Sequence, residues 1–92
     1  PHPLRSTGAF TWVLSHTARV HIDIYSLSGR RIRRLGPQES AAGFGSLAWD
    51  GTDADGRRLA SGTYVYVLTA KAVDTADEVV RQHRGAVVLL PE

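Results

Sequence analysis

The clearest pattern in the chain is the strict alternation of apolar and polar residues over 20–25, VHIDIY. Its valine and two isoleucines would point to one side of an extended segment, and His21, Asp23 and Tyr25 would point to the other. A period of two indicates a β-strand with one face in a core and the other toward water. The segment therefore predicts a strand in a sheet that has one solvated face.

Other segments carry the same β-strand signals of alternation and of aromatic or β-branched residues. They are Ala9–Leu14, Arg30–Leu35, a segment around Leu47 and Trp49, Thr63–Ala72, Glu78–Gln82 and Gly85–Leu90, the last two as one strand or two. Clusters of Gly, Pro and Ser predict the connections, of which Gly36–Gly45 is the longest loop. No segment shows a 3.6-residue stripe of helical length. The pattern predicts an all-β antiparallel sandwich of about seven strands.

The stretch Trp49–Tyr66, WDGTDADGRRLASGTYVY, reads as a turn-dense crossover between two strands. Asp-Gly occurs twice in it, at 50–51 and at 55–56, and this pair favours turns because Asp caps nearby backbone and Gly accepts positive φ. Leu59 is the single apolar residue of the loop and is predicted to pack beneath it, and Gly62 marks the return to the sheet. Alternation places Trp49, Tyr64 and Leu68 in the core with the isoleucines of the first segment.

The aspartates of the crossover, Asp50, Asp53 and Asp55, also suggest a calcium site. The EF-hand pattern requires an acidic first ligand and a glutamate six residues after its glycine. Counted from Gly56, those two positions hold Gly51 and Gly62. Turn chemistry explains the aspartates without a metal, so we expect no resident metal or cofactor, and calcium remains an alternative.

The segment RRIRRL, residues 30–35, is strongly basic. It could bind phosphate, or it could be an edge strand whose charges prevent pairing with other chains. No aromatic residue is interleaved with the arginines, and the net charge of the chain is only +2. We therefore interpret it as an edge strand, and expect neither a nucleic-acid partner nor membrane insertion.

The chain of 92 residues has 42% hydrophobic and 22% charged residues and no cysteine. These values predict one globular domain over residues 1–92 that relies on its core, with an extended lead-in at 1–8. Because the chain starts at Pro1, it is expected to be a processed product or a module of a longer protein. Its Ser, His and Asp residues form no nucleophile, metal or nucleotide motif, so no catalytic activity is expected.

The chain resembles the Ig-like, fibronectin-type-III-like module of the flagellar hook-capping protein, and equally the type IX secretion sorting domains of bacteria. The residues that carry the resemblance are PHPL at 1–4, ST at 6–7, VHIDIY at 20–25, LSGR at 27–30 with Ile32 and Leu35, WDGTD at 49–53, Gly56, LASGTYVY at 59–66 and VVLL at 87–90. Sorting domains usually end on a basic tail, whereas this chain ends Leu-Pro-Glu. The resemblance implies an Ig-like β-sandwich with a non-catalytic role at the exterior or surface of a bacterial cell.

Two functions follow from this reading. The first is a structural or interaction module, the C-terminal domain of a secreted or cell-surface bacterial protein. The alternative is a self-assembling subunit of an extracellular structure that uses its N-terminal segment or a sheet edge, and calcium or glycan binding is a third reading. The expected partner is protein, either an upstream domain or further copies. Two strands are apolar on both faces, so the surface proposed for these contacts consists of Val65, Val67, Val87 and Leu89.

Overall fold

The computed structural model describes residues 8–73 and 79–91. Six strands lie in this part of the chain: β1 (Gly8–Leu14), β2 (Ala18–Tyr25), β3 (Arg31–Ser40), β4 (Gly43–Trp49), β5 (Gly62–Ala72) and β6 (Val80–Leu89). All strand pairs are antiparallel, which confirms the predicted all-β class. The count within the described residues is one lower than the predicted seven.

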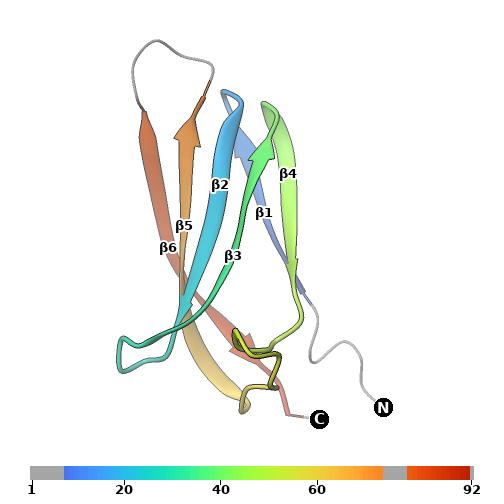
Figure 1. The fold of residues 1–92 in the computed structure, drawn as a ribbon, viewed down its shortest axis with the longest axis vertical. Coiled ribbons are helices and arrows are strands. Elements are labelled where there is room, and N and C mark those ends of the chain that lie inside the picture. The colour runs from blue at the N-terminus through green and yellow to red at the C-terminus, as the bar shows by residue number, and fades with distance from the viewer. Residues whose placement is uncertain (1–7, 74–78, 92) are drawn as a thin grey trace.

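The strands form two sheets that face each other (Figure 1). The larger has the order β3-β2-β5-β6, and the smaller consists of β1 and β4. The basic segment lies in β3 at the edge of the larger sheet, as interpreted from the sequence. Three of its arginines pair with carboxylates of the same chain, Arg31 and Arg34 with Asp23 and Arg33 with Asp50.

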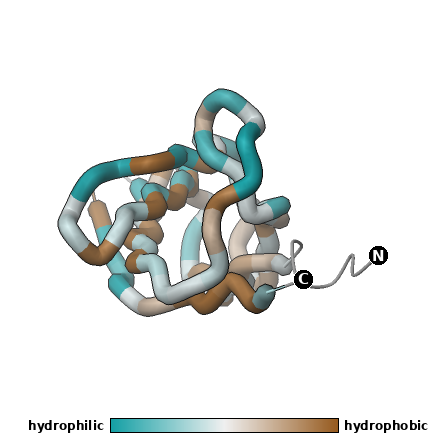
Figure 2. Tube along the Cα trace, turned by 90° about the horizontal axis from the view of Figure 1, so that it is seen from below, coloured by the Kyte–Doolittle hydropathy of each residue, from teal (hydrophilic) through white to brown (hydrophobic). Residues whose placement is uncertain are grey.

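The core fills the space between the sheets. Its fully buried side chains are Val20, Ile22 and Ile24, the apolar half of the alternating segment. The smaller sheet contributes Trp12 and Trp49, and Phe10 of β1 lies 4.9 Å from Tyr66 of β5 between ring centroids. Figure 2 looks along the strands from the crossover end and shows hydrophobic and hydrophilic residues alternating along the chain.

The prediction of a loop over Gly36–Gly45 is wrong. β3 continues through Gly36 and Pro37 to Ser40, and β4 begins at Gly43. A proline is tolerated here because β3 is an edge strand, which needs backbone donors on one side only. Gly36 has φ of +85°, and a Cβ there would approach the Val20 carbonyl oxygen to 2.8 Å, so this position requires glycine.

The C-terminal strand also differs from its prediction. Residues 80–89 form one continuous strand rather than two segments, and β6 pairs with β5 from Lys71↔Val80 to Gly62↔Leu89. The lead-in at 1–8 falls outside the described residues except for Gly8, which begins β1. Within residues 8–73 and 79–91, no helix has the length and apolar character to span a membrane.

Candidate protein-interaction surfaces

The outer face of the larger sheet, which points away from β1 and β4, carries two of the four residues predicted for protein contacts. Val65 and Val67 of β5 alternate with Tyr64, Tyr66 and Leu68, which pack into the core, and are half-buried. Val65 and Val67 therefore lie on the face of β5 that points away from the core, and their role in protein contacts stays a prediction. Their neighbours come from the turn after β2 and from β6.

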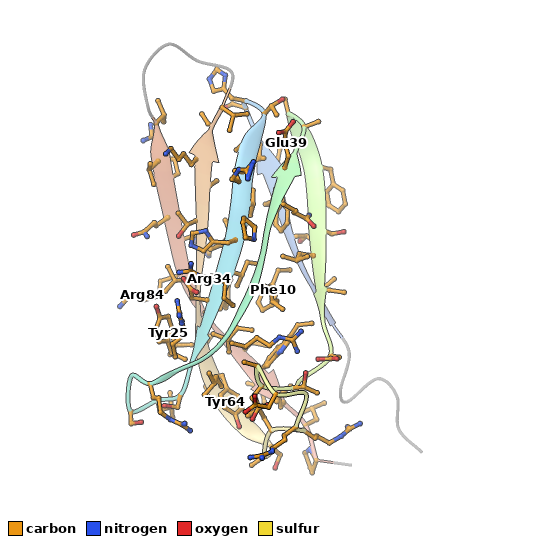
Figure 3. All side chains as sticks on the ribbon, viewed as in Figure 1. Phe10, Tyr25, Arg34, Glu39, Tyr64 and Arg84 are labelled. Atoms are coloured by element: carbon orange, nitrogen blue, oxygen red, sulfur yellow. The ribbon has the colours of Figure 1, made fainter. Side chains whose placement is uncertain are left out.

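These neighbours form a groove of about 490 Å³, which we call the outer-face groove. It is lined by Tyr25, Ser26, Leu27, Gly29, Val65, Val67, Gln82 and Arg84. Leu27 in the turn after β2 is 71% exposed and adds to the apolar surface of Val65 and Val67. Figure 3 shows Tyr25 and Arg84 close together over the larger sheet, while Phe10 lies between the sheets. The groove combines the apolar side chains of Leu27, Val65 and Val67 with polar residues and one cation, Arg84.

The predicted assignment of Val87 and Leu89 to this outer surface is wrong. Leu89 is buried in the core, and Val87 packs against the core from its partly buried position. The register pairs Tyr64 with Val87 and Thr63 with Val88, so Val87 shares the inward face of Tyr64. Val88, 57% exposed, takes the outward position instead. An apolar run such as AVVLL contains no alternation from which the inward face could be read.

A buried carboxylate stiffens the same outer face beside the groove. Asp23 is only 5% exposed, and it accepts hydrogen bonds from Arg34 Nε at 2.7 Å and Arg34 Nη2 at 3.2 Å. Arg31 Nη1 and His21 Nε2 lie 3.5 Å from its oxygens. The hydrogen bond to Asp23 raises the pKa of Arg34. This bidentate pair fixes the guanidinium of an edge-strand residue over β2.

The crossover between β4 and β5 is closed by its own hydrogen bonds. Trp49 Nε1 donates to the Thr52 carbonyl oxygen at 3.0 Å, and the Tyr64 hydroxyl donates to the Ala60 carbonyl oxygen at 2.6 Å. Leu59 N donates to the Gly51 carbonyl oxygen at 3.0 Å, and Leu59 packs against the core as predicted. Gly51 and Gly56 have φ of +79° and +82°, the positive values that the two Asp-Gly turns need.

Two of the three candidate calcium ligands, Asp50 and Asp53, accept hydrogen bonds through their carboxylates. Asp50 Oδ1 accepts from Thr52 Oγ1 at 2.6 Å, from Thr52 N at 3.2 Å and from Arg33 Nη1 at 3.1 Å. The Thr52 hydroxyl bond is the main reason that the pKa of Asp50 lies below its usual value. Asp53 Oδ1 accepts from the backbone N–H groups of Asp55 and Arg57, each at 2.9 Å.

No group of three His, Cys, Asp or Glu side chains that could hold a metal ion occurs in the part of the chain that the structure describes. The aspartates at 50 and 53 instead cap turns, as their Asp-Gly and Asp-Ala-Asp context suggests.

A second exposed apolar site was not foreseen from the sequence. Val13 and Phe44 are cross-strand partners on the outer face of the smaller sheet, 80% and 73% exposed. The signal in the sequence was Phe44 between two glycines.

Gly45 is needed because the indole of Trp12 lies over it, and a Cβ at this position would overlap the ring. Trp12 Nε1 donates a hydrogen bond to Ser40 Oγ at 3.0 Å.

The two facing antiparallel sheets, with a self-bonded crossover between them, define the class of the protein as an all-β domain of the Ig-like kind. A family model described as the FlgD Ig-like domain matches residues 4–82, and the chain belongs to this family. This confirms the hook-capping half of the resemblance in the sequence, whereas the likeness to type IX sorting domains stays a prediction.

Solved structures agree with the family assignment. The chain is similar to FlgD from P. aeruginosa, with a TM-score of 0.70 and 24% identity, over 89% of this chain and 63% of that chain. It is also similar to FlgD from Xanthomonas campestris, described for the hook capping essential for flagellar assembly, with a TM-score of 0.65 and 32% identity, over 91% of this chain and 58% of that one. The chain thus spans about three fifths of the FlgD chains it matches. A search of the curated proteins gives no match.

Proposed function

We propose that the chain is a non-catalytic structural domain of a hook-capping-type protein and acts at the exterior of a bacterial cell by binding protein. The observation that carries this proposal is the family match over residues 4–82. It favours the second of the two functions considered above, a subunit of an extracellular assembly, over a passive module appended to a secreted protein. That the two sheets form a complete Ig-like β-sandwich belongs to the same proposal.

The outer-face groove is the surface through which we propose that the domain associates with copies of itself. Its apolar walls, Val65 and Val67, lie beside an exposed Leu27 and are accessible from solvent. Burying such a patch removes apolar area from water, which favours association in proportion to the area. The pair of the buried Asp23 with the partly exposed Arg34 keeps the neighbouring surface ordered, so less side-chain freedom is lost on binding.

Sedimentation velocity over a range of concentrations tests this proposal. The wild-type chain is expected to associate with rising concentration, and Val67→Asp is expected to remain monomeric because it places a charge in the apolar part of the groove. Val13→Asp is the matched control, since Val13 is also an exposed valine but lies on the other sheet. A wild-type chain that stays monomeric at high concentration would rule out self-association and leave the appended-module reading.

A further inference from the structure

The free side of β1 is the starting point of a second inference. Among the described residues β1 pairs with β4 alone, so alternate residues of β1 direct backbone N–H and C=O groups away from β4. An unpaired strand edge of this kind is a template for another strand. The edge runs over Gly8–Leu14, which is 7 residues long. An extended partner segment of similar length, with the same rise of about 3.4 Å per residue, could pair along all of it.

Within residues 8–73 and 79–91, no strand covers the larger sheet next to this edge. A gap of about 300 Å³ is lined by Thr11–Leu14 of β1, by Leu68 and Ala70 of β5 and by Arg81–His83 of β6, with no residue of β4. It therefore lies on the β1 side, over β6. We call it the edge gap. A second hollow of about 330 Å³ shares Val13, Leu14, Ala70 and Arg81 with it and extends it along the strands.

The inward residues of β6 are buried at one end of the strand and exposed at the other, next to the edge gap. At its C-terminal end the inward positions are covered, with Leu89 buried and Val87 partly buried. Arg81 and His83 occupy inward positions of the same alternation, yet they are exposed. Among the described residues, a two-stranded sheet over a four-stranded one leaves this half of β6 uncovered. One more strand beside β1, at the usual spacing of about 4.8 Å, would lie over it.

The lining of the gap specifies the chemistry of its occupant. The inner wall is apolar, formed by the buried Trp12, Leu68 and Ala70. The outer rim carries Arg81 and His83, with the His83 ring 6.0 Å from that of Tyr66. Among residues 8–73 and 79–91, neither the edge gap nor the adjoining hollow has an acidic residue in its lining. The rim is therefore complementary to carboxylates.

We propose that the β1 edge and the edge gap bind an extended acidic segment of a partner protein by β-strand addition. The segment pairs its backbone with β1 and lies over β6. Its inward side chains are carboxylates where they face Arg81 and His83, and apolar where they face Val87. This site is separate from the outer-face groove, since it is built on the other face of β6.

A synthetic peptide with a palindromic sequence tests the site in either strand direction. The probe Thr-Val-Thr-Glu-Thr-Glu-Thr-Val-Thr places valine and glutamate on one face of a strand. It is compared with the same peptide carrying lysine for glutamate, and with one carrying proline for the central threonine, which removes a backbone donor. Titration followed by amide NMR of the full chain is expected to show binding of the glutamate peptide alone, with shifts concentrated in Gly8–Leu14.

Charge reversal on β6 tests the recognition. Arg81→Glu combined with His83→Glu is expected to weaken binding of the glutamate peptide about tenfold and to permit binding of the lysine peptide. The matched control is Arg84→Glu, because Arg84 is on the same strand but faces the outer-face groove, and it should change the affinity less than about twofold.

The proposal is overturned if glutamate and lysine peptides bind equally, if the proline peptide binds as well as its parent, or if Arg84→Glu weakens binding as much as the double variant. It is also overturned if β1 amides become protected with rising protein concentration in the absence of peptide, because the edge would then bind a second copy of the chain. Val67→Asp should leave peptide binding intact, so failure of this proposal is distinguishable from failure of self-association.

Discussion

Replacement of Trp49 is the most direct test of how the crossover is attached to the core. The side chain is 5% exposed, and its ring lies 6.5 Å from that of Phe10 and 6.4 Å from that of Tyr64, the latter edge-on. Its Nε1 also donates to the Thr52 carbonyl oxygen. The residue thus joins the smaller sheet, the larger sheet and the loop at one point.

The expected cost follows from these contacts. Trp49→Ala removes a buried aromatic side chain and leaves a cavity, for which about 3–5 kcal/mol of unfolding free energy is lost. Trp49→Phe keeps most of the ring volume and removes the indole donor. Because Arg33 Nη1 also lies 3.4 Å from the Thr52 carbonyl oxygen, that acceptor keeps a partner. The Phe variant should therefore cost only about 1–2 kcal/mol.

Urea denaturation followed by circular dichroism measures both losses without depending on tryptophan fluorescence. Phe44→Ala is the control, since Phe44 is an aromatic residue of the same strand but is 73% exposed, and it should change stability by less than about 0.5 kcal/mol. An unchanged midpoint for Trp49→Ala, or an equal loss for Phe44→Ala, would refute the placement of Trp49 as the attachment point of the crossover.

Three further predictions concern single sites. Gly45→Ala should destabilise the chain by about 1–3 kcal/mol in the same assay, because the new Cβ overlaps the Trp12 indole; a neutral result would mean that the indole can move aside. The depressed pKa of Asp50 implies stability that is present above the pKa of the unfolded chain, about 3.9, and is lost as pH falls toward the lower folded value. The stability difference between wild type and Asp50→Asn should therefore be smaller at pH 3 than at pH 7, and a difference independent of pH would contradict the assignment. Thermal midpoints in excess chelator and in millimolar calcium should agree, since the carboxylates at 50 and 53 already accept hydrogen bonds; a rise of several degrees with calcium would reveal a site.

The parts of the fold that could be predicted from the sequence are those in which the residues of a single segment indicate its structure and which of its faces is buried. The alternating segment of β2 correctly predicts a strand with an apolar inward face, but its other face is not open to water, because Asp23 is buried and His21 and Tyr25 are half-buried. The Asp-Gly turns were also local, and both glycines have the expected positive φ. In contrast, Gly36 and Pro37 suggested a loop, because composition does not reveal that the edge strand predicted over residues 30–35 continues through them.

The proposed interaction surfaces could not be predicted from any single segment, because they depend on strand register and sheet topology. The outward face of β6 is set by its register with Tyr64 of β5, so Val87 could not be assigned from its own neighbours. The outer-face groove joins Tyr25, Val67 and Arg84 from three strands that only the topology brings together. The edge gap arises from the number of strands in each sheet, which a list of strands does not give.

The pairing of β1 with β4 also has a consequence for the order of folding. Leu14 pairs with Gly43 and Gly8 with Trp49, so the contact closes a loop that contains the whole β2–β3 hairpin. Closing a long loop carries a larger entropic cost than forming a hairpin, which places the smaller sheet late in assembly. Destabilising changes in β1 are then expected mainly to accelerate unfolding and to leave the refolding rate nearly unchanged. The time for which the core isoleucines of a newly synthesised chain remain exposed to solvent would accordingly depend on how quickly β1 and β4 pair.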